Sequence, residues 1–497
     1  MANIKILAGQ AAIYGVSTIL GRLLNYLLVP LHTYMFENPA QYGIVTVLYA
    51  WTSLFMVLLT YGMETAFFRY SQIDKYKERT FSTLVISLFT TSLLFILLGT
   101  GFSQNIAGWL QSSAHSEYVI RSEYVIWLSI IIAIDAFSSI FFASLRQRMK
   151  AMKFAIIKIT NISTSIFFNL FFLILCPYLL QKDIGVDFVN TIYNPEIGVG
   201  YIFISNLIAS IVTLVLLLPE LWKIKLIFDI KLWKIMFIYA FPLLIFNLAG
   251  IVNETIDRVL LERLSPPDIA QMQVGIYGAC YKISIIITIF VQAFKYAAEP
   301  FFFNKAKDED AKQTYSDVMS IFVLVCSFVF LSVMLYLDVV QYFVGPNYRV
   351  GLSIVPILLL ANIFLGIFYN LSIWYKLTDK TKYGAYISLI GASITLLLNM
   401  ILIPRIGYMG SAWATFVCYL SMVIISYLLG RRHYQVEYKV LKIIYYILLA
   451  VAIYLFSTFF SFGNFAFKMI IHTLLLLAYI AGIFMMDRHY LKMILKR

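Results

Sequence analysis

The chain is a succession of long apolar stretches separated by short polar connections. Fourteen windows of about 20 residues hold few or no charged side chains, and each is long enough for a helix to cross a hydrocarbon core about 30 Å thick. The windows begin near Ala8, Tyr42, Phe81, Tyr118, Phe154, Gly198, Ile235, Val274, Val318, Leu352, Tyr383, Gly410, Val440 and Asn464. This pattern predicts an all-α polytopic membrane protein with 14 transmembrane helices.

Polar residues recur at helical spacing inside six of these windows: the first, second, fourth, fifth, seventh and eighth. An ionisable side chain at membrane depth costs several kcal/mol unless it faces a partner or water. These six helices are therefore expected to share a polar interior. A second interpretation is that the same residues only form hydrogen bonds and ion pairs between helices. The polar residues of interest are Arg22, Asn25, Glu64, Asp135, Lys158, Asn161, Asn169, Asn247, Glu254, Asp257, Arg258, Lys282 and Glu299.

An internal repeat relates the first half of the chain to the second. Asn25 corresponds to Asn253, and Gly43 to Gly275 after a short insertion. Glu64, three residues before a Phe-Phe pair, corresponds to Glu299, which stands at the same distance from another such pair. The repeat unit is six helices, so the two copies run in the same direction through the membrane. The predicted division is an N-terminal lobe (1–222), a C-terminal lobe (223–433) and two further helices with a tail (434–497).

The Lys and Arg residues alternate in density from one connection to the next. Most of the 38 fall in the connections that are cytoplasmic if the N-terminus is cytoplasmic. This positive-inside bias predicts that both termini lie in the cytoplasm. It also explains most of the formal charge of +13, which favours contact with anionic lipid over binding of nucleic acid.

Composition leaves little room for a soluble domain, because 61% of residues are hydrophobic and 13% are charged. The four cysteines lie in or beside different apolar windows and are interpreted as core residues, and no metal site is predicted. No P-loop, G-x-S-x-G or H-E-x-x-H motif occurs, and no cofactor is expected. Transport is therefore favoured over an enzyme of glycan assembly, while the coupling ion, H⁺ or Na⁺, stays open.

Four segments carry a family resemblance: "YGVSTILGRLLNYLLVPLHTYMF", "AQYGIVTVLYAW", "GMETAFFRY" and "VGIYGACYKISIIITIFVQAFKYAAEPFFF". They resemble the polysaccharide flippase branch, of the lipid-linked oligosaccharide or O-antigen type, of the multidrug/oligosaccharidyl-lipid/polysaccharide exporter superfamily. The resemblance implies two six-helix lobes around a central cavity. It also implies alternating access that moves a polyprenyl-diphosphate-linked oligosaccharide to the outer face of a bacterial inner membrane. A polysaccharide polymerase and glycosyltransferases of the same pathway are possible partners.

Two related functions stay open as alternatives, a lipid II flippase and a multidrug cation antiporter of the same fold. The antiporter is disfavoured because its helix 1 typically carries acidic coupling residues, whereas helix 1 here carries Arg22 and no carboxylate.

The interior residues receive roles in keeping with this chemistry. Cations suit a diphosphate and amides suit sugar hydroxyls, so the predicted substrate-binding residues are Arg22, Asn25, Lys158, Asn161, Asn169, Asn247 and Lys282. The predicted gating or charge-pairing residues are Glu64, Asp135, Glu254, Asp257, Arg258 and Glu299. Glu64 and Glu299 are expected to pair with cations of the opposite lobe at the cytoplasmic mouth. Local pairing with Arg69 or Lys295 is the alternative.

Overall fold

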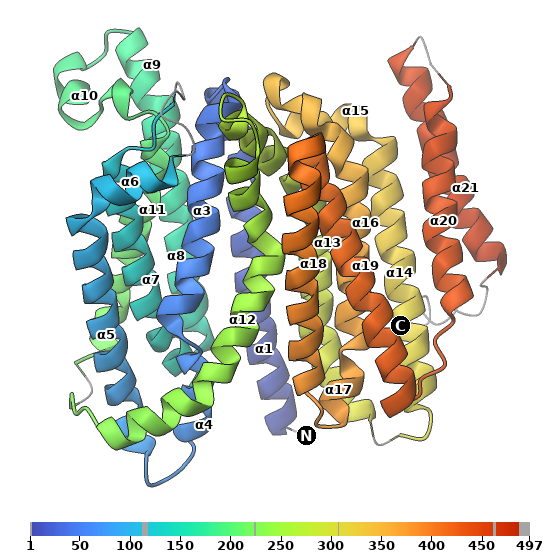
Figure 1. Cartoon of the computed structure of the whole chain (residues 1–497), viewed down its shortest axis with the longest axis horizontal. Coiled ribbons are helices and arrows are strands. Elements are labelled where there is room, and N and C mark those ends of the chain that lie inside the picture. Colours follow the sequence, from blue (N-terminus) through green and yellow to red (C-terminus); the bar gives the residue numbers. More distant parts are fainter. Residues whose placement is uncertain (1, 112–117, 223–224, 307, 461–463, 487–497) are drawn as a thin grey trace. The chain divides into compact units, whose positions relative to one another are not determined.

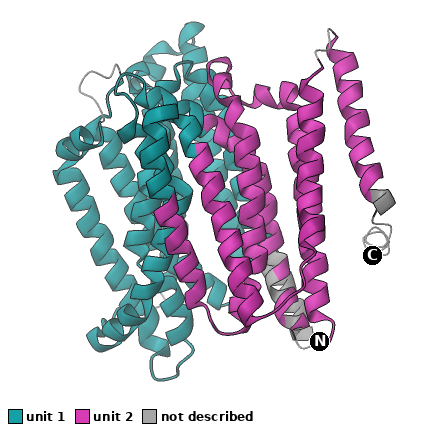
Figure 2. Ribbon diagram, turned by 45° about the vertical axis from the view of Figure 1, so that its right-hand side comes forward, with its two compact units in different colours: residues 1–278, 395–411 teal, residues 279–394, 412–497 magenta. Residues whose placement is uncertain are grey.

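A computed structural model of the chain describes residues 2–111, 118–222, 225–306, 308–460 and 464–486. Every regular element in these ranges is a helix (Figure 1). The chain forms two compact units, coloured separately in Figure 2. Unit 1 comprises residues 1–278 and 395–411, and unit 2 comprises residues 279–394 and 412–497.

The helices follow one another along the chain in the order of their labels. The first twelve are α1 (Ala2–Tyr26), α2 (Leu28–Met35), α3 (Pro39–Thr60), α4 (Met63–Tyr70), α5 (Lys77–Gly101), α6 (Ser103–Leu110), α7 (Ser122–Gln147), α8 (Ala151–Leu170), α9 (Cys176–Gln181), α10 (Val186–Ile192), α11 (Gly200–Leu217) and α12 (Ile230–Leu264). The others are α13 (Ala270–Lys305), α14 (Ala311–Leu335), α15 (Leu337–Val340), α16 (Val355–Leu371), α17 (Ile373–Leu377), α18 (Lys382–Ile406), α19 (Tyr408–His433), α20 (Val440–Thr458) and α21 (Phe465–Met486). A π-helical turn, η1 (Phe171–Leu175), joins α8 to α9, and short 3₁₀ segments are η2 (Pro195–Ile197), η3 (Leu218–Glu220), η4 (Gln341–Phe343) and η5 (Pro346–Ile354).

Within the described residues, 13 helical segments are long and apolar enough to cross a membrane. The prediction of a polytopic all-helical membrane protein is therefore confirmed, and these segments correspond to 13 of the fourteen expected helices. The remaining expected helix is α1, whose first side chains lie outside the described part of the structure. Its packing against α8, part of a candidate span, keeps it in the helical bundle of unit 1.

Two breaks in the first helices of unit 1 place residues of functional interest. α1 ends at Tyr26 and α2 begins at Leu28, because Pro30 has no amide hydrogen to continue the α-helical ladder to Tyr26. α3 ends where Tyr61 and Gly62 adopt left-handed conformations, with φ of 31° and 71°. Glu64 therefore lies in the first turn of a separate helix, α4, where a carboxylate is favoured by the helix dipole.

An aromatic and aliphatic core holds α4, α5 and α7 together. The Phe67 and Phe81 rings are 5.9 Å apart, and the Phe81 and Phe141 rings meet edge to face at 5.7 Å. Met236 and Ala240 of α12 belong to the same buried cluster. Lipid tails are as apolar as the helix surfaces, so membrane helices gain little from the hydrophobic effect when they associate. Close side-chain packing of this kind holds them together instead.

α12 belongs to unit 1, whereas the predicted lobe boundary places it in the C-terminal lobe. It packs against α3 and α4, so it belongs to unit 1 although it follows the predicted lobe boundary at residue 222. The compact units thus divide at residue 278 in this structure. The division into six-helix lobes at 222 and 433 was derived from the sequence repeat and not from packing, and it stays a prediction.

Unit 2 is built around α14, which packs against α16 and α20. Its buried polar contacts include one between α16 and α13, in which the Asn362 amide donates to the Ser284 carbonyl at 3.0 Å. The last helix, α21, contacts α20 and α14, and Lys468 forms an ion pair of 2.5 Å with Asp338. The four cysteines of the chain are buried and free, which confirms their interpretation as core residues.

Candidate functional site

Five charged side chains of unit 1 gather between α1, α4, α7 and α8. The charges of the other four all act electrostatically on Lys158, which lies on α8 and is half-buried. We call this group the unit 1 charge cluster: Arg22, Glu64, Asp135, Arg146 and Lys158. Three cations and two carboxylates leave it with one net positive charge, so it can hold an anion more readily than a cation.

Glu64 and Arg146 form the most direct contact in the cluster. An Arg146 Nη atom donates to a Glu64 carboxylate oxygen at 2.5 Å, and the guanidinium lies 5.3 Å from the centre of the Phe68 ring. Both side chains keep some exposure, 33% for Arg146 and 41% for Glu64. Among the described residues of unit 1, the partner of Glu64 is therefore Arg146 rather than Arg69. Arg69 instead lies 4.4 Å from the Tyr239 ring centre.

Lys158 and Asp135 form the deeper part of the cluster. The Lys158 ammonium lies 4.2 Å from the centre of the Phe142 ring, an arrangement in which a cation is attracted to the face of the ring. Asp135 lies three turns before Arg146 on α7, so the two share a face of that helix. The Tyr49 hydroxyl, within electrostatic reach of Asp135, accepts from the Asn206 amide at 2.9 Å.

Two of the asparagines predicted to bind sugar hydroxyls form hydrogen bonds within the protein instead. Asn161 donates to the Ala209 carbonyl at 3.1 Å and to the Thr213 hydroxyl at 2.8 Å, which ties α8 to α11. Asn169 is 1% exposed and bonds the His32 ring at 2.8 Å. In this conformation both serve helix packing.

Three other predicted polar residues are exposed. Arg22 and Asn25 on α1 and Asn247 on α12 all present accessible side chains. The break at Leu27 lies between Asn25 and His32, and His32 is buried whereas Arg22 and Asn25 are exposed. Their exposure leaves them accessible to a ligand, whereas Asn169 is enclosed.

Three of the predicted charged residues, Glu254, Asp257 and Arg258, lie in the C-terminal part of α12 and form a local network. Asp257 and Arg258 are buried and form an ion pair of 2.9 Å, and the Tyr277 hydroxyl donates to Asp257 at 2.6 Å. The Arg258 guanidinium also donates to the Glu254 carbonyl, while the Glu254 side chain is exposed. This network joins α12 to α13, and its buried ion pair helps to hold these helices together within unit 1.

The remaining two predicted residues belong to unit 2 and lie on α13. Lys282 is half-buried there. The side chain of Glu299 lies outside the described part of the structure, so its predicted gating role stays a prediction.

Sequence reasoning missed two charged residues that the structure makes prominent. In the sequence Arg146 stands among the basic residues of a predicted cytoplasmic connection, but it follows Asp135 by eleven residues, about three helical turns, and this spacing is a usable signal. Glu220 is 1% exposed and meets Lys153 at 2.7 Å and Arg148 at 3.2 Å, with Lys150 at 4.0 Å. No local pattern marks Glu220, because its partners are some 70 residues earlier in the chain.

The repeat-related glycines Gly43 and Gly275 meet in unit 1. A Cβ atom on Gly43 would lie 2.0 Å from the Gln271 carbonyl oxygen, and one on Gly275 would lie 1.8 Å from that of Pro39. One turn further, Gly278 faces Thr46. The first turns of α3 and α13 therefore cross in backbone contact that only glycine permits.

Two charged groups outside the membrane-spanning segments have shifted pKa values. Asp229 accepts from the Leu232 and Lys231 amides at the start of α12 and pairs with Arg79 at 3.3 Å, and these contacts lower the pKa of its carboxyl. Lys305, at the end of α13, donates to Asp308 at 2.7 Å, which raises the pKa of its ammonium. No group of three metal-ligating side chains occurs among the described residues.

The fold is that of membrane transporters. The chain is similar over 95% of its length to 99% of the lipid II flippase MurJ in an inward closed conformation, with a TM-score of 0.73 and 15% identity. It is similar over 84% of its length to 94% of an inward-facing multidrug resistance MATE family transporter of the MOP superfamily, with a TM-score of 0.62 and 13% identity. The MATE multidrug transporter DinF-BH gives a TM-score of 0.61 at 14% identity, with coverage of 87% of this chain and 96% of that one.

Residues 7–304 match the family model described as "Polysaccharide biosynthesis protein", and the chain belongs to this family. No curated protein matches the chain significantly. The family resemblance predicted from the sequence is confirmed. The protein is a multi-pass helical membrane protein of the polysaccharide biosynthesis family, and its fold is shared with the transporters named above.

Proposed function

We propose that the protein flips a polyprenyl-diphosphate-linked oligosaccharide from the cytoplasmic to the outer leaflet of a bacterial inner membrane, for assembly of a surface polysaccharide. The observation that carries this proposal is the family match over residues 7–304. A sugar diphosphate leaves hydroxyls and charges unsatisfied in hydrocarbon, so its transfer needs a polar path while the lipid tail stays in the membrane.

The unit 1 charge cluster supplies part of such a path. Its net positive charge suits a diphosphate, and Arg22 is exposed on α1 where a head group can reach it. Lys158 lies deeper and partly covered by the Phe142 ring. We assign Arg22 to initial contact and Lys158 to the electrostatic attraction that draws the anion inward, with Lys282 of α13 as the corresponding cation of the other half.

Alternating access between two six-helix lobes is the mechanism we propose, with α1 as a fourteenth crossing and both termini in the cytoplasm. The close crossing of α3 and α13 at Gly43 and Gly275 lies at the predicted outer ends of these helices. Transport then requires this contact to open. An inside-negative potential favours outward movement of an anion by about 2.3 kcal/mol per charge for each 100 mV fully crossed.

The test is flipping of a fluorescent prenyl-diphosphate oligosaccharide in proteoliposomes that contain the purified full chain. Arg22→Ala and Lys282→Ala should each lower the flipping rate, because each removes a proposed diphosphate contact. Arg121→Ala and Lys182→Ala are matched controls, since both residues are exposed at the predicted outer side of unit 1. Normal flipping by both R22A and K282A, with normal membrane insertion, would refute the assigned anion path.

The same preparation separates the alternatives. Flipping of lipid II in preference to the oligosaccharide lipid would assign a peptidoglycan role, and export of cationic drugs dependent on Asp135 or Glu254 would assign an antiporter. A chemical change in the lipid-linked sugar would instead identify an enzyme of glycan assembly.

A further inference from the structure

α12 is longer than a membrane crossing requires. Its 35 residues extend about 52 Å at 1.5 Å per residue, whereas a hydrocarbon core is about 30 Å thick. Pro242 lies inside the helix and removes one backbone hydrogen bond, so the helix can bend there. In Figure 1 the first part of α12 runs obliquely across the lower end of unit 1, and the helix then turns to follow α3. We call residues 230–241 the α12 entry segment.

One face of the α12 entry segment is buried within unit 1. Leu232, Met236 and Ala240 follow one another at intervals of four residues and belong to the buried core that includes side chains of α4, α5 and α7. The ring of Tyr239 meets that of Tyr70 on α4 edge to face at 5.9 Å. These contacts determine which face of the segment stays accessible.

The opposite face combines large apolar side chains with lysines. Ile230, Lys231, Lys234, Ile235 and Ile238 are all exposed, and Ile238 is exposed to 73%. On a helix these five positions fall within about 140° of the circumference. Isoleucines would be unfavourable in water, and ammonium groups would be unfavourable in hydrocarbon. The membrane interface satisfies both, because acyl chains cover the isoleucines while lysines reach the head groups.

The connection that precedes α12 continues this surface. Leu226, Ile227 and Phe228 are exposed, as is Lys225. The Ser82 hydroxyl of α5 donates to the Ile227 carbonyl at 2.8 Å, so the backbone of the connection is held against unit 1 while these side chains stay accessible. A contiguous apolar patch of this kind marks an interaction surface.

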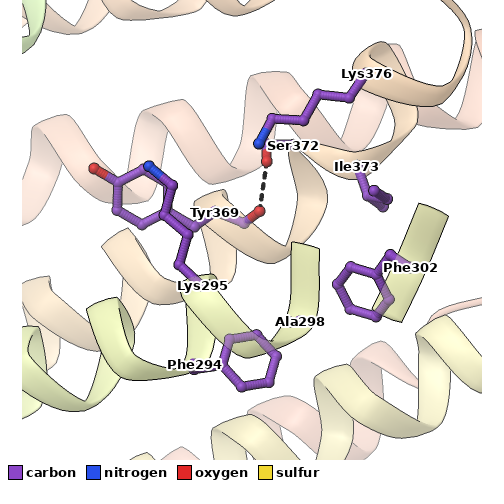
Figure 3. A pocket seen from close by; sticks show the side chains of 8 residues that line it. All are labelled: Phe294, Lys295, Ala298, Phe302, Tyr369, Ser372, Ile373 and Lys376. Atoms are coloured by element: carbon purple, nitrogen blue, oxygen red, sulfur yellow. Dashed lines mark hydrogen bonds between the residues drawn. The ribbon is translucent and has the colours of Figure 1, made fainter. Parts of the chain in front are cut away.

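The lysines of the α12 entry segment have no carboxylate partner within the described ranges of the chain. Asp229, the carboxylate nearest to them in the sequence, pairs with Arg79 at 3.3 Å. The lysines of unit 2 shown in Figure 3 are placed differently: Lys295 and Lys376 line a pocket, and the Lys295 ammonium lies 4.8 Å from the centre of the Tyr369 ring. The charge on α12 lies instead on an open face, where an anionic surface can neutralise it.

We propose that the α12 entry segment binds the anionic phospholipid head groups of the membrane surface. Lys231 and Lys234 attract the lipid phosphates, while the isoleucines of the same face contact the upper parts of the acyl chains. The positive-inside bias places this contact in the cytoplasmic leaflet. Because the buried face of the segment packs on α4, the bound lipids would also steady the helix that carries Glu64.

Fluorescence quenching in liposomes that contain the purified full chain tests this proposal. A fluorescent label is attached to Ile238→Cys or, as the depth reference, to Ile245→Cys. Both positions are exposed, two turns apart on one face of α12 and on either side of Pro242. The quenchers are phospholipids with a nitroxide close to the head group or at the end of the acyl chain, and iodide in the water. The four native cysteines are buried and should add little background.

We expect the label at position 238 to be quenched mainly by the shallow nitroxide and the label at position 245 mainly by the deep one. The shallow nitroxide is then carried by phosphatidylglycerol or by phosphatidylcholine. In the control K75Q/K77Q, which removes two exposed lysines from the connection between α4 and α5, phosphatidylglycerol should bind beside position 238 with about fivefold preference. In K231Q/K234Q this preference should disappear.

Three results with the label at position 238 overturn the proposal. Quenching chiefly by iodide means that the segment lies in water, and quenching chiefly by the deep nitroxide means that it lies in hydrocarbon. Protection from all quenchers means that another protein or a second copy of the chain covers this face.

An equal preference for phosphatidylglycerol in K231Q/K234Q and K75Q/K77Q also overturns the proposal. If K231Q/K234Q is not recovered folded, K234Q against K75Q gives the same comparison. No step of this experiment requires transport, so its outcome is independent of whether the protein flips an oligosaccharide lipid.

Discussion

Two glutamates of unit 1 form ion pairs, and the exposure of each side chain determines how much its ion pair contributes to stability. Glu64 is 41% exposed and has one cationic partner, whereas Glu220 is 1% exposed and has three. Glu64→Gln should therefore change the free energy of unfolding by less than about 1 kcal/mol, as for exposed ion pairs. Glu220→Gln should cost about 1–3 kcal/mol, because it leaves clustered cations without their carboxylate. Thermal unfolding in detergent measures both, and an E64Q loss as large as that of E220Q would contradict this ranking.

The asparagines predicted to bind sugar differ in a way that separates packing from transport. Asn169→Ala removes the bond to His32 at a buried position, so it should lower stability by about 1–3 kcal/mol. Asn25→Ala removes an exposed side chain and should leave stability unchanged while it slows flipping. The two variants are compared by thermal unfolding and by the flipping rate per folded molecule. A stable N169A protein that flips slowly would restore the substrate role.

Asp229 makes stability sensitive to acid. Its pKa is lowered in the folded state by the Leu232 amide and by Arg79, so its stabilising contribution is present above the unfolded pKa of about 4 and is lost as pH falls through the folded pKa. Asp229→Asn can still cap α12 but lacks this contribution. The gap in unfolding temperature between the wild type and D229N should thus narrow from pH 7 to pH 3. A gap that stays constant or widens would contradict the assignment.

At the level of single residues, the sequence predicted the kinds of groups at the site better than their partners. Arg22, Glu64, Asp135 and Lys158 are found in one cluster because helical spacing and the cost of charge in the membrane both limit where they can point. The partner of Glu64 could not be predicted, since Arg146 lies 82 residues away and the pairing depends on how α4 follows the break at Gly62.

Among the helices, the crossing of α3 and α13 offers the sharpest test. A side chain on Gly275 would overlap the Pro39 carbonyl oxygen, a backbone atom that cannot rotate away. Gly275→Val should therefore lower the free energy of unfolding by about 1–3 kcal/mol, the usual cost of overpacking. It should also increase labelling of a thiol introduced by Thr46→Cys, which faces Gly278 in the same crossing.

Gly250→Ala is the matched control for this helix crossing. No atom lies within 4 Å of a Cβ placed on Gly250, so the variant should be neutral or slightly stabilising, as expected for alanine in a helix. Unchanged stability and unchanged T46C labelling in G275V would mean that α3 and α13 do not cross as closely as described.

Helix existence was predictable from apolar windows, whereas helix interruptions were not. A hydrophobic pattern read over about 20 residues is an average, so a single break in the helix does not show in it. The left-handed turn at Tyr61 and the π-helical turn at Phe171–Leu175 both lie inside windows that read as continuous. The membership of α12 in unit 1 was likewise not predictable, because it depends on contacts with α3 and α4 rather than on any feature of α12 itself.

For the whole molecule, the number of crossings decides on which side the N-terminus lies. α1 has 25 residues, about 37 Å at 1.5 Å per residue, and is long enough to cross the membrane. It also packs along α8, which belongs to a candidate span. Its polar residues Arg22 and Asn25 belong to the transport path that we propose.

This reasoning predicts that α1 crosses the membrane and that residue 2 is cytoplasmic. In intact cells, a thiol introduced by Ala2→Cys should resist a membrane-impermeant maleimide and react only after permeabilisation. Lys182→Cys, on the predicted outer side, should react in intact cells, and the four native cysteines are buried and should add little background. If α1 does not cross, thirteen spans place the N-terminus outside and A2C reacts without permeabilisation. That result would also remove Arg22 from the interior of the membrane and, with it, the polar path proposed for the diphosphate.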